Sequence, residues 1–268
     1  MLYKIGDMAK LLGLSQEALR KFERRGLITP VKDEENGYRY YGTLDITSLI
    51  RCRSYHRYGF SMNEIAGLMN TRDLDFIIDK YKEREDSLRE RIRMDSLMLR
   101  YLEDIRRTTE SIQNNYQKCS QTVCPPYYSL EYMQNDVLTL SGKVWDYFSN
   151  WMERVPFSAL SIRWNKDLIL QGQTDFIASL CVPEEYAHEL AYYLGPPVVY
   201  FPARPCVYTL SSEDQNRFDA PQSFEFILDY CRERGLTPAD DPYCRTFLSY
   251  DKGGNYTRFR QIWLPVTS

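Results

Sequence analysis

The side chains best suited to chemistry near the N-terminus are polar or basic, and they recur at the spacing of a helix. Between residues 16 and 24, Ala18, Leu19 and Phe22 would form the apolar side of such a helix. The opposite side carries groups that hydrogen-bond phosphates and base edges, namely Gln16, Glu17, Arg20, Lys21 and Arg24. This chemistry is recognition of double-stranded DNA by a helix lying in the major groove.

Local signals place this helix in a helix-turn-helix followed by a wing. Apolar positions from Ile5 predict a first helix that stops at Gly13, and Ser15 caps the second, which runs to Arg25. The dipeptide Asn36-Gly37 predicts the turn of a hairpin, the wing, over Val31–Tyr41. A third helix is expected from about Leu44 to Tyr58, and a capping box at Ser61-Met62-Asn63-Glu64 begins a fourth.

Several motifs in this region, in the same order, resemble the MerR DNA-binding domain. They are Tyr3-Lys4-Ile5-Gly6, Leu19-Arg20, Phe22-Glu23, Gly26-Leu27-Ile28, Asn36-Gly37-Tyr38-Arg39-Tyr40-Tyr41 and Gly59-Phe60-Ser61. The resemblance implies a homodimeric transcription regulator in which Arg20 and Gln16 or Glu17 approach base edges, while Tyr38 and Arg39 hold the backbone or minor groove. Lys21 departs from the family, which usually has an aromatic residue there. The whole predicted DNA-binding set is Gln16, Glu17, Arg20, Lys21, Tyr38, Arg39, Tyr41, Arg51 and Arg53.

A long helix is predicted after this domain. No proline or glycine occurs from Leu74 to about Cys119, and apolar residues recur in an imperfect heptad that includes Leu74, Tyr81, Leu88 and Leu102. Such a helix is too apolar along one stripe to stand alone, so we expect an antiparallel coiled coil between two copies of the chain; a monomeric bundle is the alternative. Resemblance implies promoters with an overlong spacer, which an activated dimer distorts so that RNA polymerase can engage.

Charge and aromatic content divide the chain into two functional parts. Residues 1–70 carry eleven basic against eight acidic side chains, whereas residues 121–268 carry twelve against eighteen. All four tryptophans lie beyond residue 120. The predicted domains are a winged helix-turn-helix at 1–72, a coiled-coil dimerisation helix at 73–120 and an effector-binding domain at 121–268.

The last domain is predicted to be α+β. Strands are predicted at 158–164, 174–182, 206–211, 246–251 and 257–266, and helices near 144–151 and 221–234. The segment Gln261-Ile262-Trp263-Leu264-Pro265-Val266 resembles the closing strand of the GyrI-like ligand-binding domain of BmrR-type multidrug regulators. The resemblance implies a pocket for a hydrophobic, aromatic small molecule, neutral or cationic, such as a drug.

The family often has a glutamate at the position of Gln261, where it faces the pocket and neutralises a cation. Strand alternation puts Phe259 and Trp263 on the same side as Gln261. Aromatic side chains can substitute for a carboxylate through cation–π contacts, although they can equally fill a sheet core. The predicted effector-binding set is Trp145, Tyr147, Phe148, Trp151, Trp164, Tyr208, Tyr243, Phe259, Gln261 and Trp263.

Other site chemistry has little support in the sequence. The two histidines, His56 and His188, have no metal-site spacing, and neither a glycine-rich phosphate loop nor a G-x-S-x-G turn occurs. No catalytic residue, metal or cofactor is therefore predicted. No apolar run is long enough for a membrane span, and no apolar signal segment opens the chain, so we expect a cytoplasmic protein without a membrane partner.

Alternatives to a drug-sensing activator remain open. Cys119 and Cys124 flank the predicted end of the long helix, where thiolates would suit a metal or redox sensor. A ligand-hydrolysing domain with Glu225 activating water is a second alternative, and a domain that only sequesters ligand is a third. The sequence leaves the effector, the promoter and the direction of regulation undetermined.

Overall fold

The computed structural model describes residues 2–34, 37–140, 142–173, 175–214, 223–253 and 255–267. The chain divides into two compact units, Met1–Met98 and Leu99–Ser268, which are described separately. Three residues used in the sequence predictions, Asn36, Thr174 and Pro221, lie outside the described residues. Within the described ranges, no helix is both long and apolar enough to cross a membrane.

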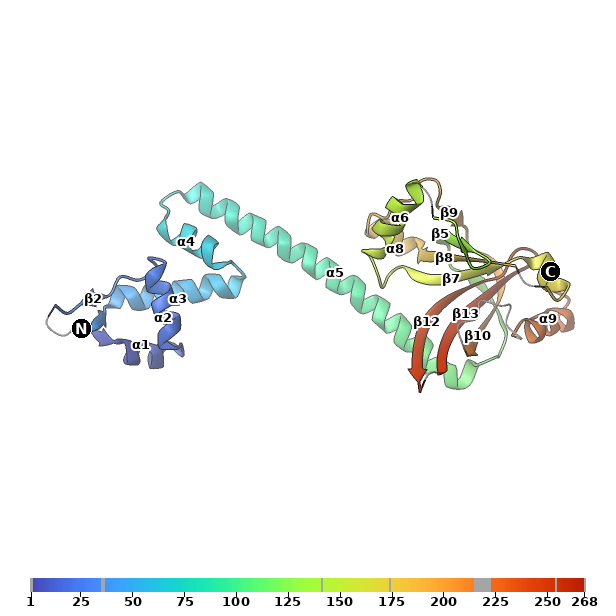
Figure 1. The fold of residues 1–268 in the computed structure, drawn as a ribbon, viewed down its shortest axis with the longest axis horizontal. Coiled ribbons are helices and arrows are strands. Elements are labelled where there is room, and N and C mark those ends of the chain that lie inside the picture. Colours follow the sequence, from blue (N-terminus) through green and yellow to red (C-terminus); the bar gives the residue numbers. More distant parts are fainter. Residues whose placement is uncertain are drawn as a thin grey trace. The chain divides into compact units, whose positions relative to one another are not determined.

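The first unit begins with the expected helix-turn-helix and wing (Figure 1). Its helices are α1 (Ile5–Leu12), α2 (Gln16–Arg24), α3 (Thr43–Tyr58) and α4 (Met62–Asn70). The wing strands β2 (Val31–Lys32) and β3 (Arg39–Tyr41) pair with each other, and β3 also pairs with β1 (Tyr3–Lys4), all antiparallel. The predicted order of elements is confirmed. Buried side chains of this unit form two clusters, one made of Met8, Leu12, Leu19, Ile28, Tyr41 and Leu49 and the other of Leu27, Cys52, Phe60, Ile65 and Leu68.

The predicted helix signals act as expected. Gly13 ends α1 with a positive φ of 62°, a backbone conformation that glycine adopts without steric cost. Ser15 Oγ accepts a hydrogen bond from the amide of Ala18 at 3.1 Å and so caps α2. At the start of α4, the Glu64 amide donates to Ser61 Oγ and the Ser61 amide donates to the Glu64 carboxylate, which confirms the capping box.

The predicted long helix is present as α5 (Leu74–Asn115), whose 42 residues extend for about 63 Å. It ends four residues before the predicted Cys119. Gln117 takes a positive φ of 54°, and its amide donates to the carbonyl of Leu210 at 2.8 Å instead of continuing the helix. Pairing with the sheet therefore replaces helical hydrogen bonds, and Ser120 already belongs to a strand.

A large antiparallel sheet forms the centre of the second unit (Figure 1). Its strands follow the order β4-β10-β13-β12-β7-β8-β5-β6, with β9 paired to β5 and β11 to β13. Their bounds are β4 (Ser120–Cys124), β5 (Tyr127–Gln134), β6 (Val137–Leu138), β7 (Ala159–Trp164), β8 (Phe176–Pro183), β9 (Val199–Phe201), β10 (Arg204–Asp214), β11 (Thr237–Pro238), β12 (Tyr243–Lys252) and β13 (Asn255–Thr267). The described helices of this unit, besides the end of α5, are α6 (Lys143–Met152), α7 (Lys166–Leu170), α8 (Glu184–Glu189) and α9 (Ser223–Glu233).

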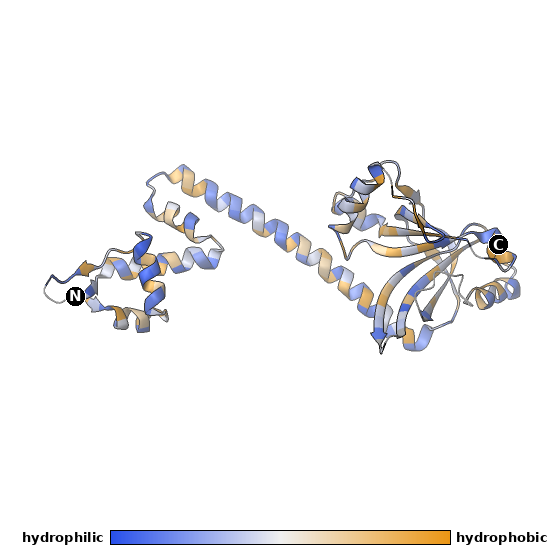
Figure 2. Ribbon diagram, viewed as in Figure 1, coloured by the Kyte–Doolittle hydropathy of each residue, from blue (hydrophilic) through white to orange (hydrophobic). Residues whose placement is uncertain are grey.

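All five predicted strands and both predicted helices are found, so the α+β reading is confirmed. The sequence did not predict β4, β5, β6, β9, β11 or the short helices α7 and α8. Figure 2 shows apolar and polar residues mixed along these strands, and β8 is buried along nearly its whole length, so both faces of the sheet are covered there. On β13, Ile262 and Leu264 point to one face and Gln261 and Trp263 to the other.

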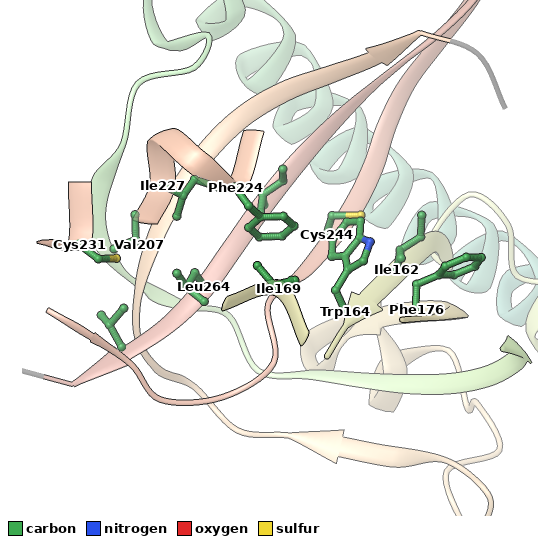
Figure 3. Close-up of a cluster of buried hydrophobic side chains, with 12 residues drawn as sticks. Ile162, Trp164, Ile169, Phe176, Val207, Phe224, Ile227, Cys231, Cys244 and Leu264 are labelled. Atoms are coloured by element: carbon green, nitrogen blue, oxygen red, sulfur yellow. The ribbon is translucent and has the colours of Figure 1, made fainter. Parts of the chain in front are cut away.

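The first face of the sheet is covered by α9 and α7. Phe224 and Ile227 of α9 and Ile169 of α7 pack on Trp164 and Leu264 from the strands (Figure 3). The ring of Trp164 lies edge-on to Phe224 at 5.3 Å between centroids. The second face carries a separate cluster, which leads to the candidate ligand site; its buried members are Cys124, Tyr127, Cys181, Cys206, Tyr243 and Trp263.

Candidate functional site

The first candidate site is the surface of α2 and the wing. Leu19 is fully buried beneath α2, and all five polar residues of the predicted face are exposed: Gln16, Glu17, Arg20, Lys21 and Arg24. Lys21 Nζ lies 3.7 Å from Glu17 Oε1, a solvent-exposed pair that contributes little to stability. The side of α2 away from the core therefore presents a row of polar and basic groups.

The wing is fixed to α2 by one ion pair. Arg39 Nε donates to Glu23 Oε1 at 2.9 Å, and this hydrogen bond raises the pKa of Arg39 further. Next to it, Tyr38 is largely exposed, with Lys4 Nζ 5.8 Å from the centre of its ring. Because Arg39 Nε is used by Glu23, the remaining guanidinium nitrogens are the ones that could reach a phosphate.

Tyr41 requires a correction. The sequence prediction placed it among DNA contacts, but its side chain is fully buried in the core of the first unit. It lies at the end of β3, where strand alternation turns it inward and leaves Tyr38 outward. Tyr41 therefore holds the wing against the helices and is removed from the predicted contacts.

The two arginines predicted on α3 differ in their surroundings. Arg53 Nη1 donates to the carbonyl of Leu12 at 2.7 Å and so satisfies the C-terminal end of α1. Arg51 is exposed. Arg53 thus stabilises the contact between α3 and the end of α1, whether or not it also contacts DNA.

The second candidate site is a cavity of about 340 Å³ in the second unit, between the sheet, α8 and the last turns of α5. Aromatic and proline side chains line part of it, and charged side chains of α5, α8 and β12 line the rest. The lining residues are Arg100, Glu103, Asp104, Arg107, Pro125, Pro183, Glu185, Tyr186, Arg245, Gln261 and Trp263. A smaller hollow continues from it beside Tyr127, Cys181 and Tyr243.

A hydrogen-bonded pair across two strands forms the polar floor of the cavity. Arg245 of β12 lies directly opposite Gln261 of β13. Gln261 Oε1 accepts from Arg245 Nη2 at 2.7 Å and from Arg245 Nε at 3.0 Å. Gln261 Nε2 in turn donates to the hydroxyl of Tyr208 at 3.3 Å, and Asp104 Oδ2 of α5 lies 3.3 Å from Arg245 Nη2. A guanidinium thus occupies the floor of the site.

Stacked rings support this floor. Tyr243 lies between Tyr127 and Trp263, with centroid distances of 4.3 and 5.1 Å and interplanar angles of 28° and 17°. Tyr127 also stacks on Phe201 at 4.8 Å. Burial raises the pKa values of Tyr127, Tyr208 and Tyr243, so these phenols stay protonated. The stack therefore presents neutral aromatic faces beside a positive charge.

The structure brings together four members of the predicted effector set: Tyr208, Tyr243, Gln261 and Trp263. Phe259 lies farther along β13, beside Tyr116 at 6.4 Å. Trp164 is buried on the opposite face of the sheet with α9, which places it outside this cavity.

The predicted aromatic residues of α6 lie apart from the cavity. Trp151 is fully buried against Tyr192, with ring centroids 5.1 Å apart, whereas Trp145 is more than half exposed. Tyr147 packs edge-on to Tyr193, and Phe148 packs on Tyr132 at 5.4 Å. The sequence prediction assigned these residues to the effector site because they are aromatic, but their contacts place them outside the cavity.

Sequence reasoning missed Arg245, Asp104, Tyr127 and Tyr186. The predicted strand began at Thr246, so Arg245 fell one residue outside it and its partnership with Gln261 was not seen. Asp104 appeared as one of many charges on a long helix. The turn between β12 and β13 would not have revealed the pair, because a bulge between Thr246 and Leu248 shifts the register; counting back from Lys252–Asn255 without it places residue 245 opposite residue 262 instead of residue 261.

The residues proposed for a metal or redox sensor and for a hydrolase lie outside this cavity. Cys119 packs on the α9 side of the sheet and Cys124 on the other side, so the two thiols are not brought together. Cys124 contacts Cys206 instead, and a hydrogen bond between the two thiols lowers the pKa of Cys124. Among the described residues, no cluster of three or more histidine, cysteine or carboxylate side chains could hold a metal ion. Glu225 is exposed on α9, away from the cavity.

Comparison with known proteins supports the assignment of the first site as a DNA-binding surface. Residues 3–72 match the sequence model of the MerR HTH family regulatory protein. The HTH-type transcriptional regulator CueR of Escherichia coli O6:H1 is 39% identical over 66 residues, which are 25% of this chain and 49% of CueR. The chain spans about half the length of the curated relatives it matches.

Two solved structures extend over the second unit. An EcmrR–DNA complex in EcmrR-RPo aligns with 99% of this chain and all of its own, at 15% identity and a TM-score of 0.35. A hydrolase from Listeria innocua aligns with 61% of this chain and 98% of its own, at 11% identity and a TM-score of 0.36. These are distant likenesses.

The helix-turn-helix, the wing and the exposed face of α2 define the first unit as a DNA-binding domain of the winged helix-turn-helix class. Over residues 3–72, about a quarter of the chain, this domain is similar to the MerR HTH family regulatory proteins. The resemblance inferred from the motifs of this region is thereby confirmed. The likeness of the C-terminal residues to GyrI-like domains stays a prediction.

Proposed function

We propose that this chain is a homodimeric, ligand-responsive transcription regulator that binds promoter DNA through α2 and the wing. The observation that carries the proposal is the exposed row of Gln16, Arg20 and Arg24 on a capped, core-anchored helix, in a domain similar to the MerR family. Arg20 and Gln16 would approach base edges, and Arg39 would hold a phosphate beside the ion pair with Glu23.

Dimerisation through α5 follows from a stripe of exposed apolar side chains. Leu88, Ile92, Leu99 and Leu102 are between 39% and 65% exposed and recur at helical spacings of four, seven and three residues. An apolar stripe on a helix of this length needs a partner, and a second copy of α5 supplies an identical one. Two DNA-reading helices held by such a pair could engage half-sites one helical turn, about 34 Å, apart.

The cavity of the second unit is the proposed effector site. Trp263 and Tyr186 offer apolar faces, and the Arg245–Gln261 pair offers polar contacts, which together are typical of a small-molecule site. By family resemblance we expect the bound effector to increase transcription, with the dimer distorting promoter DNA in favour of RNA polymerase. Because its DNA partner is a promoter, the regulator would act in the cytoplasm.

The test begins with selection of a target from a random double-stranded library by the full chain. We expect an inverted repeat, and we expect Arg20→Ala to weaken binding of the selected duplex by at least tenfold. Arg39→Ala should also make the affinity for DNA less dependent on salt: the slope of log K against log salt concentration should fall by about 1, as expected for the loss of one phosphate contact. Arg232→Ala, an exposed arginine on α9, serves as the matched control.

Two results would contradict the proposal. Equal affinity for all duplexes, together with no effect of Arg20→Ala, would refute sequence recognition by α2. A monomer on the selected duplex would refute the homodimer. Transcription in vitro with RNA polymerase and the selected site then tests the regulatory step, since the proposal predicts a change in transcript level when ligand is added.

A further inference from the structure

We propose that the cavity takes an aromatic carboxylate, whose anionic group binds Arg245 and whose ring lies against Trp263 and Tyr186. The inference rests on the proposed function, because it names the chemical class of that regulator's effector. It differs from the sequence prediction, which favoured a neutral or cationic aromatic ligand.

The buried guanidinium of Arg245 is the first reason. Its side chain is only 12% exposed, and both Nε and Nη2 donate to the single oxygen of Gln261. The described hydrogen bonds of Arg245 to Gln261 and Asp104 are made by Nε and Nη2. Gln261 must turn its oxygen toward Arg245, which leaves its amide nitrogen to donate to Tyr208. The floor therefore presents hydrogen-bond donors, and a ligand that binds there must supply a hydrogen-bond acceptor.

The weak counter-charge is the second reason. The carboxylate that pairs with Arg245 belongs to Asp104, whose side chain is 46% exposed and whose Oδ2 lies 3.3 Å from Nη2. A buried charge needs a well-placed partner of opposite sign. A planar carboxylate can pair with a guanidinium through two parallel hydrogen bonds, which suits Arg245 better than a single long contact.

The remaining charges of the cavity do not supply this partner. Arg100 pairs with Glu189 of α8 at 3.1 Å and leaves no excess charge there. Glu103 and Glu185 also line the cavity and would favour a cation, and Arg107, which lines it too, donates through Nε to the carbonyl of Glu103 at 3.4 Å. Arg245 lies deeper, at the floor, where Trp263 and Tyr186 are each only 6% exposed. When the aromatic ring of a ligand lies against Trp263 and Tyr186, a charged group attached to that ring therefore lies next to the guanidinium of Arg245.

The size of the cavity limits the ligand. A volume of about 340 Å³ is near the lower end of the range for small-molecule sites, so one or two fused rings with one acidic group fit it. Such a ligand would compete with Asp104 for Arg245. Because Asp104 is part of α5, occupancy of the cavity would release a contact between the floor and this helix.

The test is calorimetric titration of the full chain with three ligands of one shape: 2-naphthoate, its neutral analogue 2-naphthamide and the cationic 2-naphthylmethylammonium. We expect naphthoate to bind at least tenfold more tightly than the amide, and the ammonium to bind more weakly still. Arg245→Gln should remove the preference for naphthoate over the amide. Asp104→Asn should tighten naphthoate severalfold and leave the amide unchanged, and Arg232→Gln should change neither.

The outcomes separate this inference from the proposed function. Equal binding of the three ligands, or a preference for the ammonium, would overturn the inference and leave a ligand-responsive regulator standing. A lack of binding by all three would overturn the inference and count against the cavity as an effector site, whereas DNA binding would be unaffected. If Arg245→Gln does not fold, Asp104→Asn decides, and unchanged naphthoate affinity in that variant would overturn the inference.

Discussion

Replacing Gln261 by glutamate should remove the preference of the cavity for an anionic ligand. In Gln261→Glu, a carboxylate would occupy the place where Gln261 Oε1 now lies, 2.7 and 3.0 Å from the two guanidinium nitrogens of Arg245. The hydroxyl of Tyr208 can rotate to donate where it now accepts. The floor would change from a net positive charge to a neutral ion pair, without a change in the size of the side chain.

The magnitude follows from Coulomb's law. A ligand carboxylate about 4 Å from a guanidinium gains about 4 kcal/mol at an effective dielectric constant near 20, and about 1 kcal/mol in bulk water. Arg245 is mostly buried, but the cavity opens to solvent, so a loss of about 2 kcal/mol is expected. That loss weakens 2-naphthoate binding about 30-fold. The cationic 2-naphthylmethylammonium should gain by a similar factor.

Titration calorimetry of the wild type and two variants measures this effect. Gln261→Met is the matched control, since it removes the acceptor oxygen but adds no charge. If Gln261→Glu binds naphthoate as tightly as the wild type, or if Gln261→Met loses as much affinity as Gln261→Glu, then charge at the floor does not select the ligand and the reasoning is refuted.

Three further predictions concern the first unit and α5. Ile92→Glu places a charge in the exposed apolar stripe and should convert the dimer to a monomer in light scattering, whereas Arg91→Glu, one residue away, should not; a dimer in both would argue against the stripe. Leu19→Ala removes a fully buried side chain and should lower the free energy of unfolding by about 2–5 kcal/mol in urea titrations, with a smaller loss contradicting its place in the core. Hydrogen bonds from Ser61 hold the pKa of Glu64 below its usual range, so the charged cap stabilises the fold above the unfolded-state pKa of about 4.3 and this contribution is lost as the pH falls through the lower folded value. The stability difference between wild type and Glu64→Gln should therefore be present at pH 7 and shrink below about pH 4, and a difference independent of pH would count against it.

Much of the first unit could be predicted because its signals are local. Gly13, Ser15 and the Ser61–Glu64 box each act within one turn of helix, and all three work in the structure as the sequence indicates. Tyr41 was misplaced because β3 has only three residues, too few for sequence alternation to reveal which ring turns inward. The burial of that ring depends on the helices packed around it.

The cysteine alternative shows how separation along the chain can mislead. Cys119 and Cys124 looked like neighbours because they were expected to flank a helix end. Once α5 stops at Asn115, β4 follows, and residues five apart in extended chain point to opposite faces. The sheet thus gives Cys124 a different neighbour, Cys206, which is more than eighty residues away in sequence.

The candidate cavity depends in the same way on pairing between distant residues. The sequence identified Gln261 as a departure from the family's glutamate, and a neutral floor seemed to follow. Arg245 changes that conclusion, because its guanidinium is held by the oxygen of Gln261. With glutamate at 261 the pair would be neutral, and with glutamine the positive charge of Arg245 remains for a ligand. The charge that the cavity offers is therefore a property of the two residues together, and it requires the register of β12 against β13 as well as their identities.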